Sequence, residues 1–304
     1  MARPSGTPRV RQPAVAGMFY PAEPGACRAA AERFIRTPHA LPAPTEGFGE
    51  VHGGIVPHAG WVCSGAIAGQ TIGALAAARA HVDVVIVFGA VHTPGDLDVA
   101  ALSSHDTWRE PSEDSVVAEE IEAKLSERGG ALFVTDDRFH ENEHAVEVEL
   151  PLIQAAWPGV RIVPIEVPLV DDAETIGRQA AAAVMQTGLS AVYLASSDLT
   201  HYGPAYGFTP VGVGESGLAW AKDNDRRVLE LVTGLAVQRV VPDVRARMNA
   251  CGGGAIAAMM SACREAGANR ATVLRHASSY ETLREVAPQP PTNAVGYAGV
   301  VVGR

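Results

Sequence analysis

Apolar runs alternate with amphipathic stretches along most of the chain. Continuous runs rich in β-branched residues are typical of buried strands, and shorter apolar segments predict further strands. The predicted strands cover residues 51–56, 82–88, 97–102, 131–134, 161–167, 190–195, 271–277 and 296–302. Apolar residues at helical spacing predict helices over residues 26–35, 64–78, 112–127, 145–156, 173–185, 218–233, 241–248 and 252–266.

Strands that alternate with helices indicate an α/β protein, in which a sheet lies between layers of helices. The isolated strands at 97–102 and 296–302 favour a mixed, mostly parallel sheet. Neither an internal repeat nor a break in composition divides the sequence. We therefore expect a single α/β domain over residues 13–304, preceded by a disordered arm over residues 1–12.

Composition narrows the function classes. The 304 residues are 47% hydrophobic and 19% charged, with a formal net charge of −10, so nucleic acid and anionic membranes are poor partners. No apolar run reaches the roughly 20 residues that cross a bilayer, and Met1–Pro13 lacks the apolar core of a signal peptide. The four cysteines include no CxxC pair. These features predict a cytoplasmic protein with free thiols.

Three residues with metal-binding side chains share a similar position. His58 and His92 each follow a predicted strand, and Cys251 stands just before a glycine run that opens a predicted helix. Ligands of α/β sheets bind at the carboxyl ends of strands, and a helix N-terminus favours the thiolate. Two imidazoles and a thiolate suit zinc, copper or iron. Taken singly, each residue is more often structural.

Asp198 and His201 follow the predicted strand 190–195 and form a second candidate cluster. One interpretation is a hydrogen-bonded acid/base pair at the edge of the sheet. The other is a turn in which Asp198 caps the chain and His201 is solvated.

The segment His140-Glu141-Asn142-Glu143-His144 matches HExxH, the signature of zinc peptidases. Apolar periodicity begins only at Ala145, so His140 is expected outside the following helix. His144 and Glu147, three residues apart, share a face once the helix begins.

Several short motifs together resemble the Memo family, called AmmeMemoRadiSam system protein B in prokaryotes, from about Pro13 to Val302. The motifs are Ala16–Tyr20, Pro57–Gly60, Gly89…His92, Glu143–Glu147, Ser196–Asp198…His201…Gly203, Cys251-Gly252 and Gly296–Gly299.

The resemblance implies a fold similar to that of class III extradiol dioxygenases and one mononuclear transition metal, Fe(II) or Cu, with Zn as a further candidate. It implies His58, His92 and Cys251 as metal ligands. Three further residues match polar positions of the same pocket, and we assign them catalytic roles: His144, Asp198 and His201. Trp61, Glu147 and Gly252 are expected in the pocket wall. Four residues depart from the family pattern near the ligands: Ala90, Val91, Gly253 and Gly254.

The function predicted from these residues is an oxidoreductase that uses its metal for redox or O₂ chemistry on a small molecule, with His201, oriented by Asp198, as acid/base. One alternative is a non-catalytic module that binds a peptide or anion, and another is a zinc peptidase acting through HExxH. The resemblance also implies AMMECR1-like and radical-SAM proteins as possible partners, and an oligomer is possible.

Overall fold

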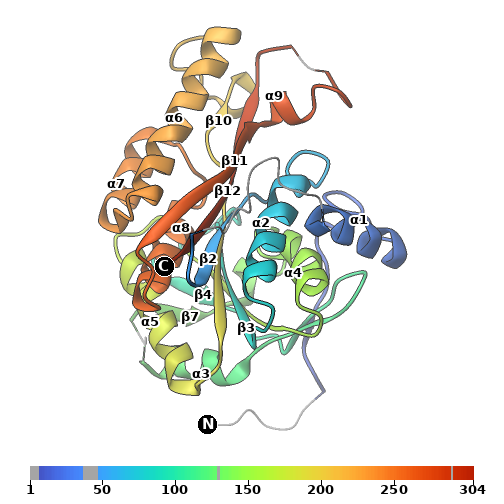
Figure 1. Ribbon diagram of the computed structural model, residues 1–304, viewed down its shortest axis with the longest axis vertical. Coiled ribbons are helices and arrows are strands. Elements are labelled where there is room, and N and C mark those ends of the chain that lie inside the picture. Colours follow the sequence, from blue (N-terminus) through green and yellow to red (C-terminus); the bar gives the residue numbers. More distant parts are fainter. Residues whose placement is uncertain (1–6, 37–46, 129–130, 289) are drawn as a thin grey trace.

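The computed structural model describes residues 7–36, 47–128, 131–288 and 290–304. Its centre is a large sheet with helices on both faces (Figure 1). Within the described residues, the strands follow the order β10-β12-β2-β9-β3-β8-β4-β7, and β11 pairs with β12. They are β2 (Val51–Val56), β3 (Val84–Gly89), β4 (Ala100–Leu102), β7 (Phe133–Thr135), β8 (Arg161–Glu166), β9 (Ala191–Ser196), β10 (His201–Tyr202), β11 (Arg270–Ser278) and β12 (Ala294–Gly303).

The middle of the sheet is parallel and both flanks contain reversed strands. The pairs β2–β9, β9–β3 and β3–β8 are parallel, whereas β12 runs antiparallel to β2 and β4 runs antiparallel to β8. The mixed α/β sheet predicted from the sequence is therefore confirmed. The four central strands end at one edge, where residues 57–58, 90–92, 167–169 and 197–198 follow them.

Two groups of helices cover the two faces of the sheet (Figure 1). One face carries α1 (Pro24–Arg36), α2 (Gly65–Ala78) and α4 (Leu150–Ala156), which pack on one another. The other carries α3 (Glu119–Arg128), α5 (Ala173–Thr187), α6 (Glu215–Thr233), α7 (Val237–Arg247) and α8 (Gly253–Glu265). The short elements α9 (Ser279–Thr282), η1 (Asp137–Phe139), η2 (Glu147–Glu149) and η3 (Pro204–Tyr206) lie in connections.

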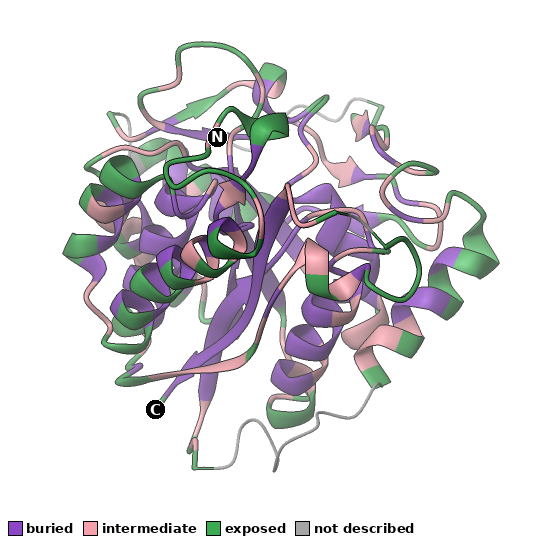
Figure 2. Ribbon diagram, turned by 90° about the horizontal axis from the view of Figure 1, so that it is seen from above, coloured by how far each residue is buried: buried purple, intermediate pink, exposed green. Residues whose placement is uncertain are grey.

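The central strands are mostly apolar because both of their faces are covered. Every residue of β3 is buried, with Ile86 and Phe88 in one hydrophobic core and Val85 and Val87 in the other. Figure 2 shows this buried sheet between helices whose outer faces are exposed. Among the helices of the described part, none has the length and apolar content needed to cross a bilayer.

A second, three-stranded sheet corrects the prediction for the N-terminus. It consists of β1 (Val10–Arg11), β5 (Thr107–Trp108) and β6 (Ser115–Val116). The predicted disordered arm over residues 1–12 is wrong at its end, because Val10 pairs with Thr107 and the Arg11 side chain is buried. Residues 1–6 lie outside the described ranges.

Two predicted helices begin later than expected. The helix predicted over 112–127 starts only at Glu119, because Ser115 and Val116 join the small sheet instead. The helix predicted over 145–156 starts at Leu150, after the 3₁₀ turn η2, and Pro151 lies in its first turn where it costs no hydrogen bond. His144 therefore lies in a loop.

Candidate metal centre

Three histidines converge at the carboxyl edge of the central strands. His58 follows β2, His92 follows β3, and His144 comes from the loop before η2. One nitrogen from each ring lies within 4.8 Å of the nitrogens of the other two. The rings of His92 and His144 stack with centroids 4.6 Å apart, and the His58 ring meets both edge-on. The sequence separates these residues by up to 86 positions, so only the sheet topology brings them together.

The hydrogen bonds of His58 fix its tautomer. The Ser196 hydroxyl donates to the carbonyl oxygen of Ala145 at 2.6 Å, so its oxygen accepts from Nδ1 of His58 at 2.9 Å. Nδ1 therefore carries the proton, and Nε2 keeps its lone pair. This arrangement, with one ring nitrogen donating to the protein and the other free, is the one found in histidines that bind metals.

Glu143 orients the other two rings. Its Oε1 accepts from Nδ1 of His92 at 2.9 Å and lies 3.3 Å from Nδ1 of His144. Its carboxylate also accepts the backbone N–H groups of His92, Thr93 and His144. Nδ1 of each histidine thus faces a protein oxygen atom, which leaves Nε2 as the other ring nitrogen that could bind a ligand.

Cys251 lies beside this cluster. Its Sγ is 3.3 Å from Nε2 of His58. Roughly tetrahedral bonds of about 2.0 Å to nitrogen and 2.3 Å to sulfur would separate two ligands of one ion by about 3.5 Å. The loop before α8 is held against the end of β9, since Ala250 bridges to Leu199 and the Cys251 N–H donates to the carbonyl oxygen of Asp198.

The glycines around Cys251 let α8 approach the sheet closely. A Cβ atom on Gly254 would lie 2.0 Å from the carbonyl oxygen of Pro168, and one on Gly252 would lie 2.8 Å from Cβ of Ser197. Gly253, where a Cβ atom would lie 2.7 Å from side-chain atoms of Leu169 and Val244, and Gly254 depart from the family pattern, and close packing explains both. They place the thiol beside the histidines.

The charges around the cluster favour a cation. Burial opposes charge on His92, but Cys251 and Glu143 outweigh it and raise the pKa of His92 to about 11. Burial lowers the pKa of His58 well below its ordinary value, and the neighbouring His92 and His144 lower it further. Burial also opposes charge on Glu143, yet its bonds to His144 and His92 hold its pKa well below the usual range. Glu143 and Cys251 thus favour a positive charge on the His92 ring, while the neighbouring His58 stays neutral.

Asp198 and His201 have separate partners, so the predicted acid/base pair is absent. Oδ1 of Asp198 accepts the backbone N–H of His58 at 2.9 Å, while Nδ1 of His201 donates to the carbonyl oxygen of Leu199 at 3.1 Å. Burial raises the pKa of Asp198 to about 7, although its bonds to backbone N–H groups oppose this. Asp198 thus fixes the backbone that carries His58, and His201 is oriented by the backbone after β9.

An apolar cavity of about 310 Å³ opens beside Cys251 and His201. The remaining side chains that line it are mostly apolar: Leu169, Tyr206, Phe208, Val244, Arg245, Met248 and Ala250. The Tyr206 ring meets the His201 ring edge-on at 5.1 Å. The cavity volume is at the lower end of the range for small-molecule sites.

Two residues expected in the pocket wall have other surroundings. Trp61 packs against Tyr20 and Phe34 in a hydrophobic core, and its Nε1 donates to a backbone carbonyl oxygen. Glu147 is fully buried and accepts the Tyr20 hydroxyl at 2.7 Å. Both residues therefore support the structure beneath the site. Gly252 follows Cys251, and its N–H donates to the Ser197 hydroxyl oxygen.

The zinc peptidase alternative does not fit the structure. His140 follows η1 and lies outside any α-helix, so it shares no helical face with His144. Its ring is fully buried against Trp108, and burial lowers its pKa to about 4. The three-histidine cluster uses His144 without His140.

Sequence reasoning missed the residues that orient the cluster. Glu143 was visible as the acidic neighbour of His144, and its place in the HENEH segment was the available signal. Ser196 lies in a recognised motif, but a hydroxyl has no pattern that marks it as the partner of a histidine. Arg11, assigned to a disordered arm, contacts the loop that carries Glu143.

The fold and this cluster define an α/β protein with a candidate metal centre at the carboxyl edge of its sheet. The family model for Memo-like proteins matches residues 11–301. The MEMO1 family protein of Methanococcoides burtonii is 31% identical, covering 96% of this chain and 100% of that protein. The one from Thermococcus onnurineus is 32% identical, with 96% and 99% covered. The chain therefore belongs to the Memo family.

Among solved structures, the uncharacterized protein JW3007 from Escherichia coli K12 aligns over 98% of this chain and 100% of its own, at 11% identity and a TM-score of 0.44. Family membership confirms the resemblance that the sequence motifs indicated. It gives no specific reaction, substrate or metal.

Proposed function

We propose that the protein is a metal-dependent oxidoreductase that oxidises a small organic molecule with O₂. The observation that carries the proposal is the convergence of His58, His92 and His144, whose ligand nitrogens lie within 4.8 Å of one another while each Nδ1 faces a protein oxygen atom. These three imidazoles and the Cys251 thiol would hold one ion. Imidazole with a soft sulfur ligand suits copper or iron, and zinc fits the same donor set. A bound copper or iron ion would supply one-electron redox chemistry.

The cavity beside Cys251 supports a small substrate. Its volume of about 310 Å³ is too small for a folded partner or a long peptide and suits a compact, largely apolar molecule. This favours an enzyme over the peptide-binding module, which would need an extended groove.

His201 has the properties of a general base in this cavity. Its Nδ1 proton is committed to the Leu199 carbonyl oxygen, and burial lowers its pKa, so the ring is neutral and Nε2 accepts a proton. A neutral imidazole in a binding cavity removes a proton from a hydroxyl or amine group efficiently near neutral pH.

The test separates metal binding from chemistry. Metal-stripped protein, reconstituted anaerobically with Fe(II) or Cu(I), should bind about one equivalent, as a single site requires. The double variant His58→Ala/Cys251→Ser should lose this equivalent, whereas His201→Ala should keep it. Oxygen uptake across a panel of phenols and catechols should occur in the wild type and disappear in His201→Ala.

Unchanged stoichiometry in the double variant would refute the site. Full metal loading without O₂ uptake for any compound would favour a binding protein over an oxidoreductase. Partnership with AMMECR1-like or radical-SAM proteins remains part of the proposal and is tested by co-purification from cells that express all three.

A further inference from the structure

Arg11 is buried among the backbone of the loop that supplies His144. Its side chain is 1% exposed, and its guanidinium lies over the Trp108 ring with Cζ 4.5 Å from the centroid. Nε and Nη2 both donate to the carbonyl oxygen of His140, at 3.1 and 3.0 Å, and Nη2 also donates to that of Glu143 at 2.6 Å. Nη1 donates to the Glu147 carboxylate. One planar group thus binds three points of the loop 140–147.

The loop has little regular structure of its own. Between η1 and η2 it forms turns, and its backbone bonds include Glu143 N–H to the His140 carbonyl oxygen at 3.3 Å. Yet it carries both Glu143, which orients His92, and the His144 ring. The backbone of Glu143 is bound directly by Arg11, so the position of its carboxylate depends on that contact.

The N-terminal segment is attached to the same loop at further points. Glu147 accepts the backbone N–H groups of Ala14 and Val15 at 2.8 and 3.0 Å, in addition to the Tyr20 hydroxyl. The Phe19 ring then meets the His144 ring edge-on at 4.9 Å. Residues 10–20 therefore touch the loop both beneath Glu143 and against His144.

We propose that Arg11 is a positioning residue for the metal centre. It holds the loop so that His144 and, through Glu143, His92 face His58. This inference rests on the proposed metal-binding function. An arginine is required because its flat fork reaches two carbonyl oxygens and a carboxylate at once, whereas a lysine ammonium is a point donor.

The test compares two arginines that bind backbone carbonyls. Arg11→Lys keeps the charge beside Glu147 but loses the fork. The control is Arg79→Lys. Arg79 donates to the carbonyl oxygens of Val51 and Ala191, which open β2 and β9 at the edge of the sheet away from the histidines. Metal-stripped proteins are titrated with Co²⁺ and followed by visible absorption. Arg11→Lys should bind one equivalent about 10–100-fold more weakly, as loss of an outer hydrogen-bond partner does, with an altered spectrum. Arg79→Lys should stay within about twofold of the wild type.

A second readout needs no metal. Long-range ¹⁵N–¹H NMR spectra of the histidine rings should show shifted His92 and His144 signals in Arg11→Lys and unchanged ones in Arg79→Lys. If Arg11→Lys does not fold, Glu147→Gln, which weakens the ion pair of Arg11 and keeps its carbonyl contacts, should give the same changes to a smaller extent.

Ring signals and Co²⁺ affinity that match those of Arg79→Lys would overturn the role of Arg11. A wild type that binds no Co²⁺, combined with ring signals that move in Arg11→Lys, would refute the metal function and leave the positioning role standing.

Discussion

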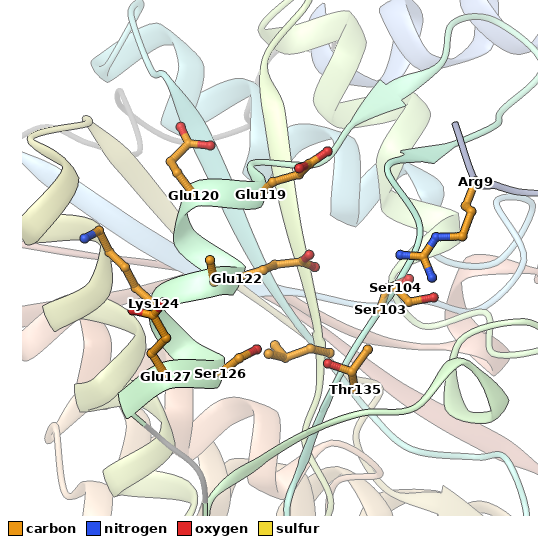
Figure 3. Close-up of a pocket in the computed structure, with 12 residues that line it drawn as sticks. Arg9, Ser103, Ser104, Glu119, Glu120, Glu122, Lys124, Ser126, Glu127 and Thr135 are labelled. Atoms are coloured by element: carbon orange, nitrogen blue, oxygen red, sulfur yellow. The ribbon is translucent and has the colours of Figure 1, made fainter. Parts of the chain in front are cut away.

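Two cavities of the molecule differ in size and in the side chains that line them. Among its described lining residues, the larger cavity has no histidine or cysteine that could bind a metal ion. The cavity between α3 and β4 has a volume of about 870 Å³, against about 310 Å³ for the one beside Cys251. Figure 3 shows the larger cavity, with the acidic side chains of α3 on one side and Arg9, Ser103 and Ser104 on the other.

The difference follows from how each cavity is built. One helix, α3, supplies most of the polar lining of the larger cavity, and its carboxylates include an exposed pair, Glu120 with Arg161 at 2.5 Å. The smaller cavity is lined by residues that follow β8, by β10 and the loop after it, by α7 and by the loop before α8, so distant parts of the sequence face one another there. Convergence of three histidine rings and a thiol, rather than volume, identifies the candidate site.

The largest expected effect is on metal binding. His92→Ala removes a proposed metal ligand and should lower the affinity for Co²⁺ by more than about 100-fold. Loss of a residue that only hydrogen-bonds to a ligand costs about 10–100-fold, and loss of the ligand itself should cost more. Glu119→Gln combined with Glu120→Gln, in the larger cavity, should leave the affinity within about twofold. Equilibrium dialysis with metal analysis measures both. A loss of Co²⁺ affinity in the Glu119→Gln/Glu120→Gln variant, with wild-type affinity in His92→Ala, would place the metal site in the larger cavity instead.

A second prediction concerns pH and the buried His140. Asp137 accepts the backbone N–H of Ser104, which lines the larger cavity, while Arg11 binds the carbonyl oxygen of the buried His140. Burial lowers the pKa of His140 from 6.5 to about 4. Below about pH 6.5, His140 therefore binds more protons in the unfolded chain than in the folded one. The contribution of His140 to the free energy of unfolding should fall by about 2 kcal/mol from pH 7 to 5.

His140→Phe keeps a ring against Trp108 and removes this titration. Urea unfolding gives the free energy of unfolding at pH 7 and pH 5. The decrease between the two pH values should be about 2 kcal/mol smaller in His140→Phe than in the wild type. His81→Gln, at an exposed position, serves as the control and should keep the wild-type loss. An unchanged loss in His140→Phe would show that other buried groups dominate the acid response.

A third prediction tests strain at the rim of the smaller cavity. Met248 follows α7 with φ of 52°, a left-handed conformation that glycine adopts readily. Met248→Gly should raise the free energy of unfolding by about 1 kcal/mol. Met185→Gly, at an equally exposed methionine inside α5, should lower it by about 1 kcal/mol. The midpoints of urea unfolding measure both changes. If both variants were less stable than the wild type, or both more stable, the left-handed conformation of Met248 would not be a source of strain.

The smallest effect is expected at the larger cavity. Glu120→Gln removes an exposed ion pair with Arg161 and should cost about 0.5 kcal/mol or less. A double-mutant cycle with Arg161→Gln measures the pair directly. A coupling energy several times larger would mean that this cavity is organised by its charges.

The sequence predicted the parts of the fold whose pattern is strong. The continuous apolar runs of β3 and β9 and the small-residue stretch of α8 allow only buried elements, and His58, His92 and Cys251 were placed correctly at strand ends and before a helix. Their convergence required the strand order, which the family resemblance supplied. His144 was assigned a catalytic role, and the structure places it in the candidate metal-binding cluster.

The rest lacked a local signal. Strands of two residues, such as β1, are too short to show a period, so Arg11 was placed in an arm. The partners of Asp198 and His201 are backbone groups, and every residue carries those, so side-chain patterns could not reveal them. The late start of α4 depends on tertiary bonds to Glu147, which come from residues more than 100 positions away.

The position of β12 has a consequence for biosynthesis. This strand lies between β2, which leads to His58, and β10, which contains His201. A chain emerging from the ribosome cannot complete the sheet around these residues until 294–303 have been translated and released. The edge of the sheet beside β2 is thus completed by the strand of the described part that is synthesised last, after the residues of the three-histidine cluster.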